Sequence, residues 1–200
     1  MLRVALTGGI ATGKSHILRL FSSRGIPTID ADQVAREVVE PKRDAWFELR
    51  KRFGARVCSS DGTVDRAYLA ALVFSNVGAR HELQAIVHPH VRRRIDDWFR
   101  SLRTENLRSF AVAEIPLLFE TKRETEFDWI VVTICEPNTQ KKRLMERHAF
   151  SADDAQKRID AQLPISVKSE RANTVIRTDG SFENTERQFD ATCNTLKQRC

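Results

Sequence analysis

The sequence has few cysteines and no long apolar segment, and each shortage excludes a class of protein. Its four cysteines, Cys58, Cys135, Cys193 and Cys200, lie far apart, with neither a C-x-x-C pair nor the histidine spacing of a zinc site. Neither a metal knuckle nor a disulfide framework is predicted, and a reducing cytosol fits this usage. No run reaches the roughly 18 apolar residues of a membrane helix. The apolar start at 2–6 is too short for a signal-peptide core, so we expect a soluble, cytoplasmic protein.

The sequence also lacks a concentrated charge of one sign. It has 33 Lys and Arg against 27 Asp and Glu, a formal net charge of +6, and the basic residues are spread over many segments. Such an excess suits polyanionic ligands in general, nucleotides and nucleic acids alike. There is no basic tail or arm, internal repeat or low-complexity tract, so we expect neither a nucleic-acid nor a membrane partner.

Strand and helix patterns alternate along most of the 200 residues, of which 41% are hydrophobic. Apolar, β-branched runs predict strands at 2–7, 27–29, 108–113, 129–134 and 174–176. Helical spacing predicts helices at 14–24, from Asp30 into Val34–Val39, and at 137–148, 151–161 and 182–197, with Gly25 ending the first and Ser151–Asp154 resembling a capping box. Alternation of this kind predicts a single α/β domain with a parallel sheet.

The stretch from Pro41 to about Ser101 contains no good strand and is predicted to be a helical insertion. Helices are expected at 45–53, 67–74, 80–87 and 91–102. Within it, 60–62 marks a turn and Asp65 is a plausible N-cap. Pro89 stands where a first-turn proline is tolerated, just ahead of the last of these helices.

The pattern G-x-x-x-x-G-K-[ST] is met by Gly8, Gly13, Lys14 and Ser15, directly after the first strand and before a helix. It arises by chance in on the order of one chain in a hundred of this size. In this context the loop's N–H groups and the helix's positive end would surround phosphates, Lys14 would contact the β- and γ-phosphates, and Ser15 would supply a hydroxyl to Mg²⁺. The alternative, a glycine-rich turn with an exposed lysine, does not account for the flanking elements.

A phosphate loop does not by itself separate kinases from GTPases, helicases or transport ATPases. A GTPase would usually carry an N-K-x-D motif, which this sequence lacks, since Asn138 is followed by Thr139. Asp30 and Asp32 stand at the exit of the second strand, where ligands of open parallel sheets lie. One of them is the expected base for an acceptor hydroxyl, and either alone could instead cap the following helix.

Three further residues have two interpretations each. Glu114, after the strand at 108–113, would hold Mg²⁺ through water or serve as an ion-pair partner. Arg143 and Arg147, four residues apart on one predicted helix, would stabilise charge on the transferring phosphoryl group or form a solvated basic face.

Longer segments resemble the dephospho-coenzyme A kinase family nearly end to end. The marks are LTGGIATGKS at 6–15, IDAD at 29–32, DGTVDR at 61–66, HPHVR at 88–92, EIPLLFE at 114–120, and then Gln140, Arg143-Leu144, Arg147, and Arg158 with Gln162. The resemblance implies ATP-dependent phosphorylation of the 3′-hydroxyl of the dephospho-CoA ribose, giving CoA and ADP in the last step of coenzyme A biosynthesis. ATP, Mg²⁺ and dephospho-CoA are the implied cofactors and substrate.

The same resemblance implies a three-layer fold of the P-loop NTPase type in three parts. These are a nucleotide-binding core at 1–40, 103–136 and 172–200, an acceptor-binding helical insertion at about 41–102, and a lid at about 137–171. By this match Asp32 is the general base and acts with Lys14 and Arg143, while His88, Arg92 and Arg147 bind substrate. The implied nucleotide-binding residues are Gly8, Gly9, Ile10, Ala11, Thr12, Gly13, Lys14, Ser15 and His16, with Ser15 also on the metal.

Some positions leave the family's common pattern. Ala11 stands where glycine is frequent, His16 where threonine is usual, and His148-Ala149 where a polar residue and glycine often follow. Ala172-Asn173 and Thr178-Asp179-Gly180 stand where the family tends to have Ala-Asp and Asn-x-Gly, in the part that the resemblance places near the adenine of ATP. Without the family resemblance, the position of His88 before a proline in a helical stretch would indicate a helix cap or a core residue. The rival functions are another small-molecule or nucleoside monophosphate kinase and a nucleic-acid-dependent ATPase.

Overall fold

The computed structural model describes residues 1–104 and 109–200. The chain forms two compact units, which are described separately: unit 1 comprises Met1–Asp30 and Leu102–Cys200, and unit 2 comprises Ala31–Ser101. Within the described ranges, no helix combines the length and the apolar character that crossing a membrane requires.

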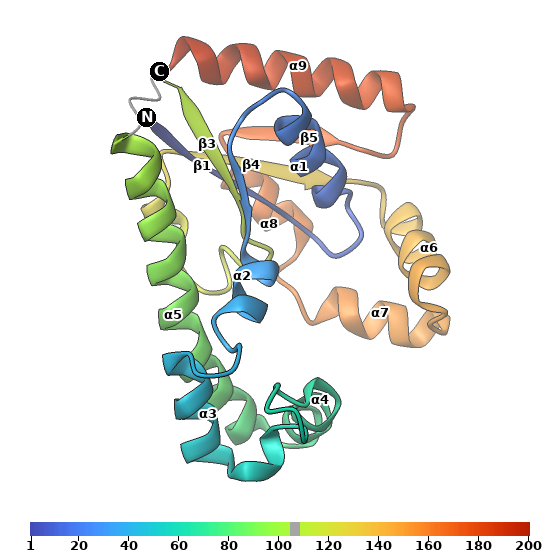
Figure 1. Cartoon of the computed structure of the whole chain (residues 1–200). Coiled ribbons are helices and arrows are strands. Elements are labelled where there is room, and N and C mark those ends of the chain that lie inside the picture. The colour runs from blue at the N-terminus through green and yellow to red at the C-terminus, as the bar shows by residue number, and fades with distance from the viewer. Residues whose placement is uncertain (105–108) are drawn as a thin grey trace. The chain divides into compact units, whose positions relative to one another are not determined.

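Unit 1 is built on a parallel sheet of five strands in the described residues, as the alternating pattern predicted. The strands are β1 (Leu2–Gly8), β2 (Thr28–Asp30), β3 (Phe110–Glu114), β4 (Trp129–Ile134) and β5 (Thr174–Arg177), in the order β2-β3-β1-β4-β5 (Figure 1). Arg108, assigned to the third strand from sequence, lies outside the described residues, and Glu114 is the last residue of β3 rather than following it. All of β3 is buried, as expected for a strand covered on both faces.

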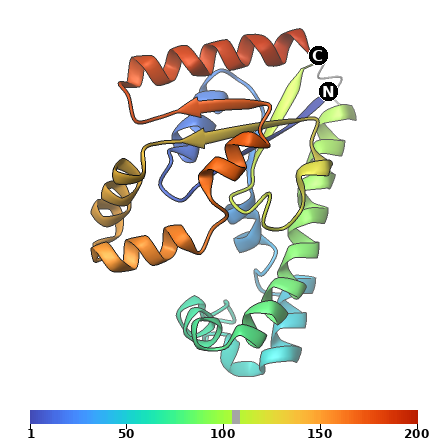
Figure 2. The same cartoon turned by 180° about the vertical axis from the view of Figure 1, so that it is seen from behind.

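Helices cover both faces of this sheet. The helices of unit 1 are α1 (Lys14–Ser23), α6 (Pro137–His148), α7 (Ala152–Asp160), α8 (Ile165–Glu170) and α9 (Phe182–Gln198). Of these, α1, α8 and α9 contact the strands, whereas α6 and α7 lie beyond the strand ends and contact each other. Helices α1 and α9 share one apolar core with the sheet, in which the Phe21 ring meets those of Phe110 and Phe189 edge-on, with centroids 6.0 and 4.7 Å away. Helix α8 lies against β4 on the other face (Figure 2). The three-layer P-loop NTPase-type arrangement follows.

Local sequence signals explain where several of these helices begin and end. Gly25 ends α1 as predicted, with φ +73°, and the N–H of Ile26 donates to the carbonyl of Phe21 at 3.1 Å. Ser151 caps α7 by accepting from the N–H of Asp154 at 3.1 Å, and the Asp154 carboxylate accepts from the Ser151 hydroxyl. Helix α8 was not predicted, because its six residues are too few to show a period.

Unit 2 contains α2 (Ala31–Glu37), α3 (Asp44–Phe53), α4 (Arg66–Ser75) and most of α5 (Val77–Thr104). Short 3₁₀ turns occur at Ala55–Val57 here and at Glu124–Glu126 in unit 1. The predicted turn is present, with Gly62 at φ +83° and the Asp61 carboxylate accepting from the Thr63 N–H at 2.9 Å. The Asp65 cap is confirmed, since its carboxylate accepts from the N–H of Tyr68 at 2.9 Å.

One prediction about unit 2 is wrong. The helices expected at 80–87 and 91–102 form a single helix, α5, with Pro89 in its interior instead of in a first turn. An interior proline loses one backbone hydrogen bond and crowds the preceding turn. Residues on both sides of it are buried in close packing, Ala79 before and Val91, Ile95 and Phe99 after. We attribute the continuity of the helix to that packing.

Candidate functional site

The phosphate loop lies at the point where the strand order of the sheet reverses. β1 has β3 on one side and β4 on the other, and Gly8 ends it before α1 begins at Lys14. Gly13 caps α1 in the left-handed conformation, φ +88°, and the first turn of the helix carries no acidic side chain. The carboxyl end of a strand at such a reversal, followed by a helix N-terminus, is a site for anionic ligands.

Other parts of unit 1 approach the three glycines of the loop closely. A Cβ on Gly8 would stand 2.5 Å from the carbonyl oxygen of Thr133, and one on Gly9 would stand 2.8 Å from the Gln140 amide nitrogen. A Cβ on Gly13 would be 3.2 Å from the hydroxyl of Thr178. A side chain at Gly8 would therefore displace the loop or β4, whereas one at Gly9 would meet the flexible end of the Gln140 side chain.

Polar contacts inside the loop fix its shape. The buried Lys14 ammonium donates to the carbonyls of Gly9 at 2.8 Å and Gly8 at 3.4 Å, whereas Ser15 is exposed. The Thr12 hydroxyl donates to the Gly9 carbonyl at 2.8 Å and pairs with the Thr133 hydroxyl at 2.7 Å. The lysine thus lies along the loop, within reach of whatever phosphate the loop surrounds.

The two unusual loop residues have distinct environments. Ala11 adopts φ +58°, a left-handed conformation that an alanine takes at a cost of about 1 kcal/mol or more. The His16 ring meets the Phe182 ring edge-on, with centroids 5.4 Å apart. Lys14 and Ser15, the loop residues expected to contact phosphate and Mg²⁺, are unaffected by either departure.

Two glutamines hold one residue of the loop. The N–H of Ile10 donates to Oε1 of Gln162 at 2.7 Å, and its carbonyl accepts from Nε2 of Gln140 at 2.8 Å. Gln140 lies in α6 and Gln162 shortly after α7, so both come from the segment predicted as a lid.

Carboxylates stand at the same edge of the sheet as the loop. Asp30, at the end of β2, is opposite Glu114, at the end of β3, which is in turn opposite Leu6 of β1. β3 thus separates Asp30 from the strand that carries the loop. Asp32 is in the first turn of α2, in unit 2. Hydroxyl and carboxylate oxygens, such as those of Ser15 and Glu114, are the ligands that Mg²⁺ prefers. The described residues contain no group of three or more His, Cys, Asp or Glu side chains that could hold a metal ion by themselves.

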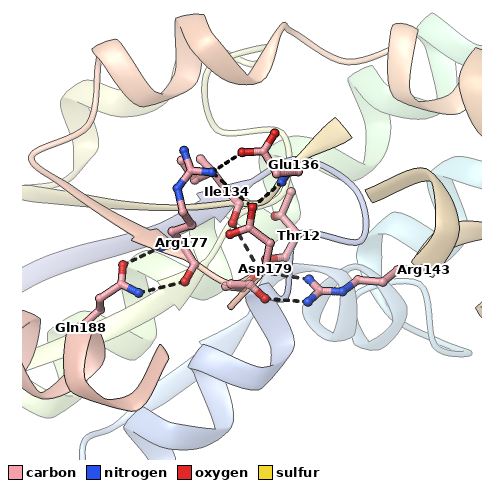
Figure 3. A network of polar contacts seen from close by, with 8 residues as sticks. Thr12, Ile134, Glu136, Arg143, Arg177, Asp179 and Gln188 are labelled. Carbon is pink, nitrogen blue, oxygen red and sulfur yellow. Dashed lines mark hydrogen bonds and ion pairs between the residues drawn. The ribbon is translucent and has the colours of Figure 1, made fainter. Parts of the chain in front are cut away.

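Arg143 and Arg147 occupy different surroundings. The Arg143 guanidinium donates to the carbonyl of Thr178 at 2.6 Å and to its hydroxyl at 3.0 Å, and that hydroxyl donates to the Thr12 carbonyl at 2.9 Å (Figure 3). Arg143 therefore connects α6, the loop after β5 and the phosphate loop. Arg147 is exposed, one turn further along the helix.

Figure 3 also shows an ionic network beside this connection. Arg177 contacts Glu136 at 2.7 Å and Asp179 at 3.2 Å, and Asp179 accepts from the N–H of Glu136 at 2.9 Å. Burial alone would raise the pKa of Asp179, but the backbone N–H donors and Arg177 outweigh it and hold that pKa below its ordinary 3.8. The Glu136 carboxylate, followed by Asp179, raises the pKa of Arg177.

His88 and Arg92 are four residues apart on α5, in unit 2, and share a face of the helix. His88 is exposed and lies in the helix interior. The alternatives considered from sequence, a cap or a core residue, are therefore wrong for it.

Several residues of the site were missed from sequence. Gln140 and Gln162 were noticed as marks of a family but given no role, and Thr133 and Thr178 were not considered as neighbours of the loop. Polar residues at the ends of apolar strands were the available signal, since Thr133 is near the end of β4 and Thr178 directly follows β5.

The sequence and the structure were compared with known proteins to identify relatives. The family model described as dephospho-CoA kinase matches residues 2–184. A dephospho-CoA kinase of Geobacillus kaustophilus is 41% identical over 188 residues, covering 94% of this chain and 93% of that protein. The structure resembles dephospho-CoA kinase from Campylobacter jejuni, with a TM-score of 0.75, 25% identity and 98% of each chain covered.

A more distant likeness supports the fold alone. Shikimate kinase from Bacteroides thetaiotaomicron aligns with a TM-score of 0.51 at 14% identity, over 98% of each chain. The whole-length matches, together with a phosphate loop at the strand reversal, lead to one conclusion: this chain belongs to the dephospho-CoA kinase family.

Proposed function

We propose that this protein transfers the γ-phosphoryl group of ATP to the 3′-hydroxyl of the dephospho-CoA ribose, giving CoA and ADP. The observation that carries the proposal is the phosphate loop of residues 8–15, held at the strand reversal in a chain whose relatives match it over almost its full length. A nucleoside monophosphate or shikimate kinase would share the sheet and the loop, so the acceptor must be tested directly.

In this mechanism the loop amides and the N-terminus of α1 bind the β- and γ-phosphates, and Lys14 leaves its carbonyl partners to neutralise charge on them. The Ser15 hydroxyl, and Glu114 through water, would hold Mg²⁺, which would neutralise charge on the same oxygens. Asp32 accepts the proton of the attacking hydroxyl and aligns its oxygen with the phosphorus.

The remaining proposed residues bind and orient. His88 and Arg92, on one face of α5, bind the acceptor, and Arg147 binds the anionic substrates from α6. Arg143, connected through Thr178 to the loop, stabilises charge on the transferring group. Closure of segment 137–171 over the substrates would exclude water, which otherwise competes for the phosphoryl group.

The test is ADP release by the purified protein with Mg·ATP and a panel of acceptors: dephospho-CoA, AMP, CMP and shikimate. We expect turnover with dephospho-CoA alone, with CoA identified by mass, and its loss in excess chelator. Turnover with another member of the panel, or ATP hydrolysis stimulated by DNA or RNA, would replace the proposed acceptor.

Two variants separate the proposed roles. Asp32→Asn should keep ATP affinity within about twofold and lose at least about 10²-fold in kcat, because only the proton acceptor is removed. Lys14→Ala should weaken ATP binding and turnover together. A near-normal kcat in Asp32→Asn would exclude that residue as the base.

A further inference from the structure

Both backbone polar groups of Ile10 form hydrogen bonds with side chains from distant parts of the sequence. Its N–H donates to Gln162 and its carbonyl accepts from Gln140, at 2.7 and 2.8 Å. With both groups bonded on opposite sides, this part of the loop cannot rotate without breaking a partly buried hydrogen bond. A single contact would not impose that constraint.

The next residue explains why the loop needs outside support. Ala11 is left-handed at φ +58°, a conformation that its Cβ disfavours and that glycine would adopt freely. Unsupported, the backbone around Ala11 would relax toward the right-handed or extended regions and turn the Ile10 peptide with it. Gly9 makes the support sterically feasible, because a Cβ there would stand 2.8 Å from the Gln140 amide nitrogen.

Gln162 is itself held in place by its neighbours. The N–H of Leu163 donates to Oε1 of Glu120 at 3.0 Å, and the same oxygen lies 2.6 Å from the ammonium of Lys168. The Lys168 side chain is fully buried, and Glu120 follows β3 in the segment EIPLLFE. The backbone next to the glutamine is therefore held to the segment that follows β3, through a carboxylate that is itself paired with the buried Lys168.

We propose that Gln140 and Gln162 are positioning residues that hold the Ile10 peptide in the orientation in which the phosphate loop receives the nucleotide. They act through the loop and touch no reacting atom. The same contacts connect the loop to segment 137–171, so that the two respond together to bound nucleotide. This inference rests on the proposed function for the identity of the nucleotide, ATP.

The first test compares Gln162→Leu with Gln156→Leu. Gln156 is exposed on α7, and its amide donates to Asp160, outside the loop. ATP dissociation constants are measured by calorimetry without acceptor, kcat and KM by ADP release, and exchange of the Ile10 amide by NMR. For Gln162→Leu we expect ATP binding about tenfold weaker, Ile10 exchange at least about tenfold faster, and an unchanged KM for dephospho-CoA. Gln156→Leu should match the unaltered protein.

A second variant tests the role of the strained alanine. In an Ala11→Gly background, the loss of ATP affinity caused by Gln162→Leu should shrink to about threefold or less, because glycine has no drive to leave the left-handed region. Thermal unfolding of each variant verifies that it folds, and Gln140→Leu should give a loss that is not additive with that of Gln162→Leu.

Two results would overturn the inference. Unchanged ATP affinity in Gln162→Leu would show that the contact does not position the loop, and tighter binding would show that the glutamine competes with phosphate for the Ile10 amide. Binding and exchange are measured without acceptor, so they decide the matter even if dephospho-CoA proves not to be the substrate.

Discussion

The phosphate loop and segment 137–171 both contain sharp backbone turns, but different atoms fix them. At Gly8, Gly9 and Gly13 atoms of distant residues approach within 2.5 to 3.2 Å of where a Cβ would lie, and at Gly8 one of these atoms is a backbone oxygen. At the end of α6 the left-handed residue is Ala149, φ +52°. The loop is shaped by contacts with residues far away in the sequence, whereas this turn is formed by residues close to one another.

Local contacts also dominate around the turn between α6 and α7. The His148 and Phe150 rings stack with centroids 5.2 Å apart, and the Arg158 guanidinium lies 4.1 Å from the centroid of Phe150. These partners are close in sequence, so this turn can form with little help from the sheet. The difference teaches that a phosphate-binding motif can be recognised from sequence although its geometry is set elsewhere in the unit.

The largest effect is expected for Gly8→Ala. The new Cβ would overlap both the carbonyl and the hydroxyl of Thr133, at 2.5 Å each, so the loop or β4 must move. We expect a loss of about 3 kcal/mol in the free energy of unfolding, measured by urea titration, together with loss of ATP binding. Gly25→Ala is the control, because Gly25 is also left-handed but has no atom within 4 Å of its Cβ position. It should cost about 1 kcal/mol and keep ATP binding, and equal losses for the two would contradict the crowding argument.

Lys168→Met tests how segment 137–171 is anchored. It leaves Glu120, whose side chain is 21% exposed, without the ammonium beside it. We expect a loss of about 2 kcal/mol in the free energy of unfolding. This is less than the ~3–5 kcal/mol lost when one partner of a fully buried ion pair is removed. Adding Glu120→Gln should recover part of the loss, and Lys157→Met, on the exposed surface of α7, should change little. A loss from Lys157→Met as large as that from Lys168→Met would show that burial of the pair is not the cause.

Ala149→Gly should stabilise the protein, because glycine adopts the left-handed conformation of this C-cap without the steric strain that a Cβ causes. An increase of about 0.5–1 kcal/mol is expected in chemical denaturation. Ala161→Gly is the matched change, since Ala161 also follows a helix but is right-handed, φ −72°. The Ala161→Gly variant should lose about 0.5 kcal/mol or more in the free energy of unfolding. If both variants were stabilised, or both destabilised, the left-handed backbone at Ala149 would not be the source of strain.

The smallest effect concerns pH. Because the pKa of Asp179 is lowered on folding, its contribution to stability is fully present above its ordinary value of 3.8 and is lost as the pH falls through the lowered value. Asp179→Asn should therefore be less stable than the unaltered protein at pH 6, and the difference should shrink as the pH falls below 3.8 and through the lowered pKa of Asp179. Melting temperatures between pH 2.5 and 7 measure it, and a difference that persists at the acid end would show that the lost contribution is not ionic.

Much of the fold could be predicted because its signals are local. The apolar strands, the Gly25 stop and the Asp65 and Ser151 caps depend on residues within a few positions of one another. The course of α5 through Pro89 could not be predicted, since packing of Val91 and Ile95 outweighs a local preference for a break. Helix α8 gave no signal because its six residues are too few to show a period.

The sequence by itself determined that a phosphate loop follows a buried strand, that the sheet is parallel, and that the chain resembles one kinase family, because these depend on residue order and spacing. Tertiary structure decided which atoms make the loop's glycines necessary and that two glutamines, about 130 and 150 positions away, hold Ile10. Those contacts form only when β4 pairs with β1, β5 pairs with β4, and segment 137–171 reaches the loop. No local pattern encodes a meeting between residues so far apart.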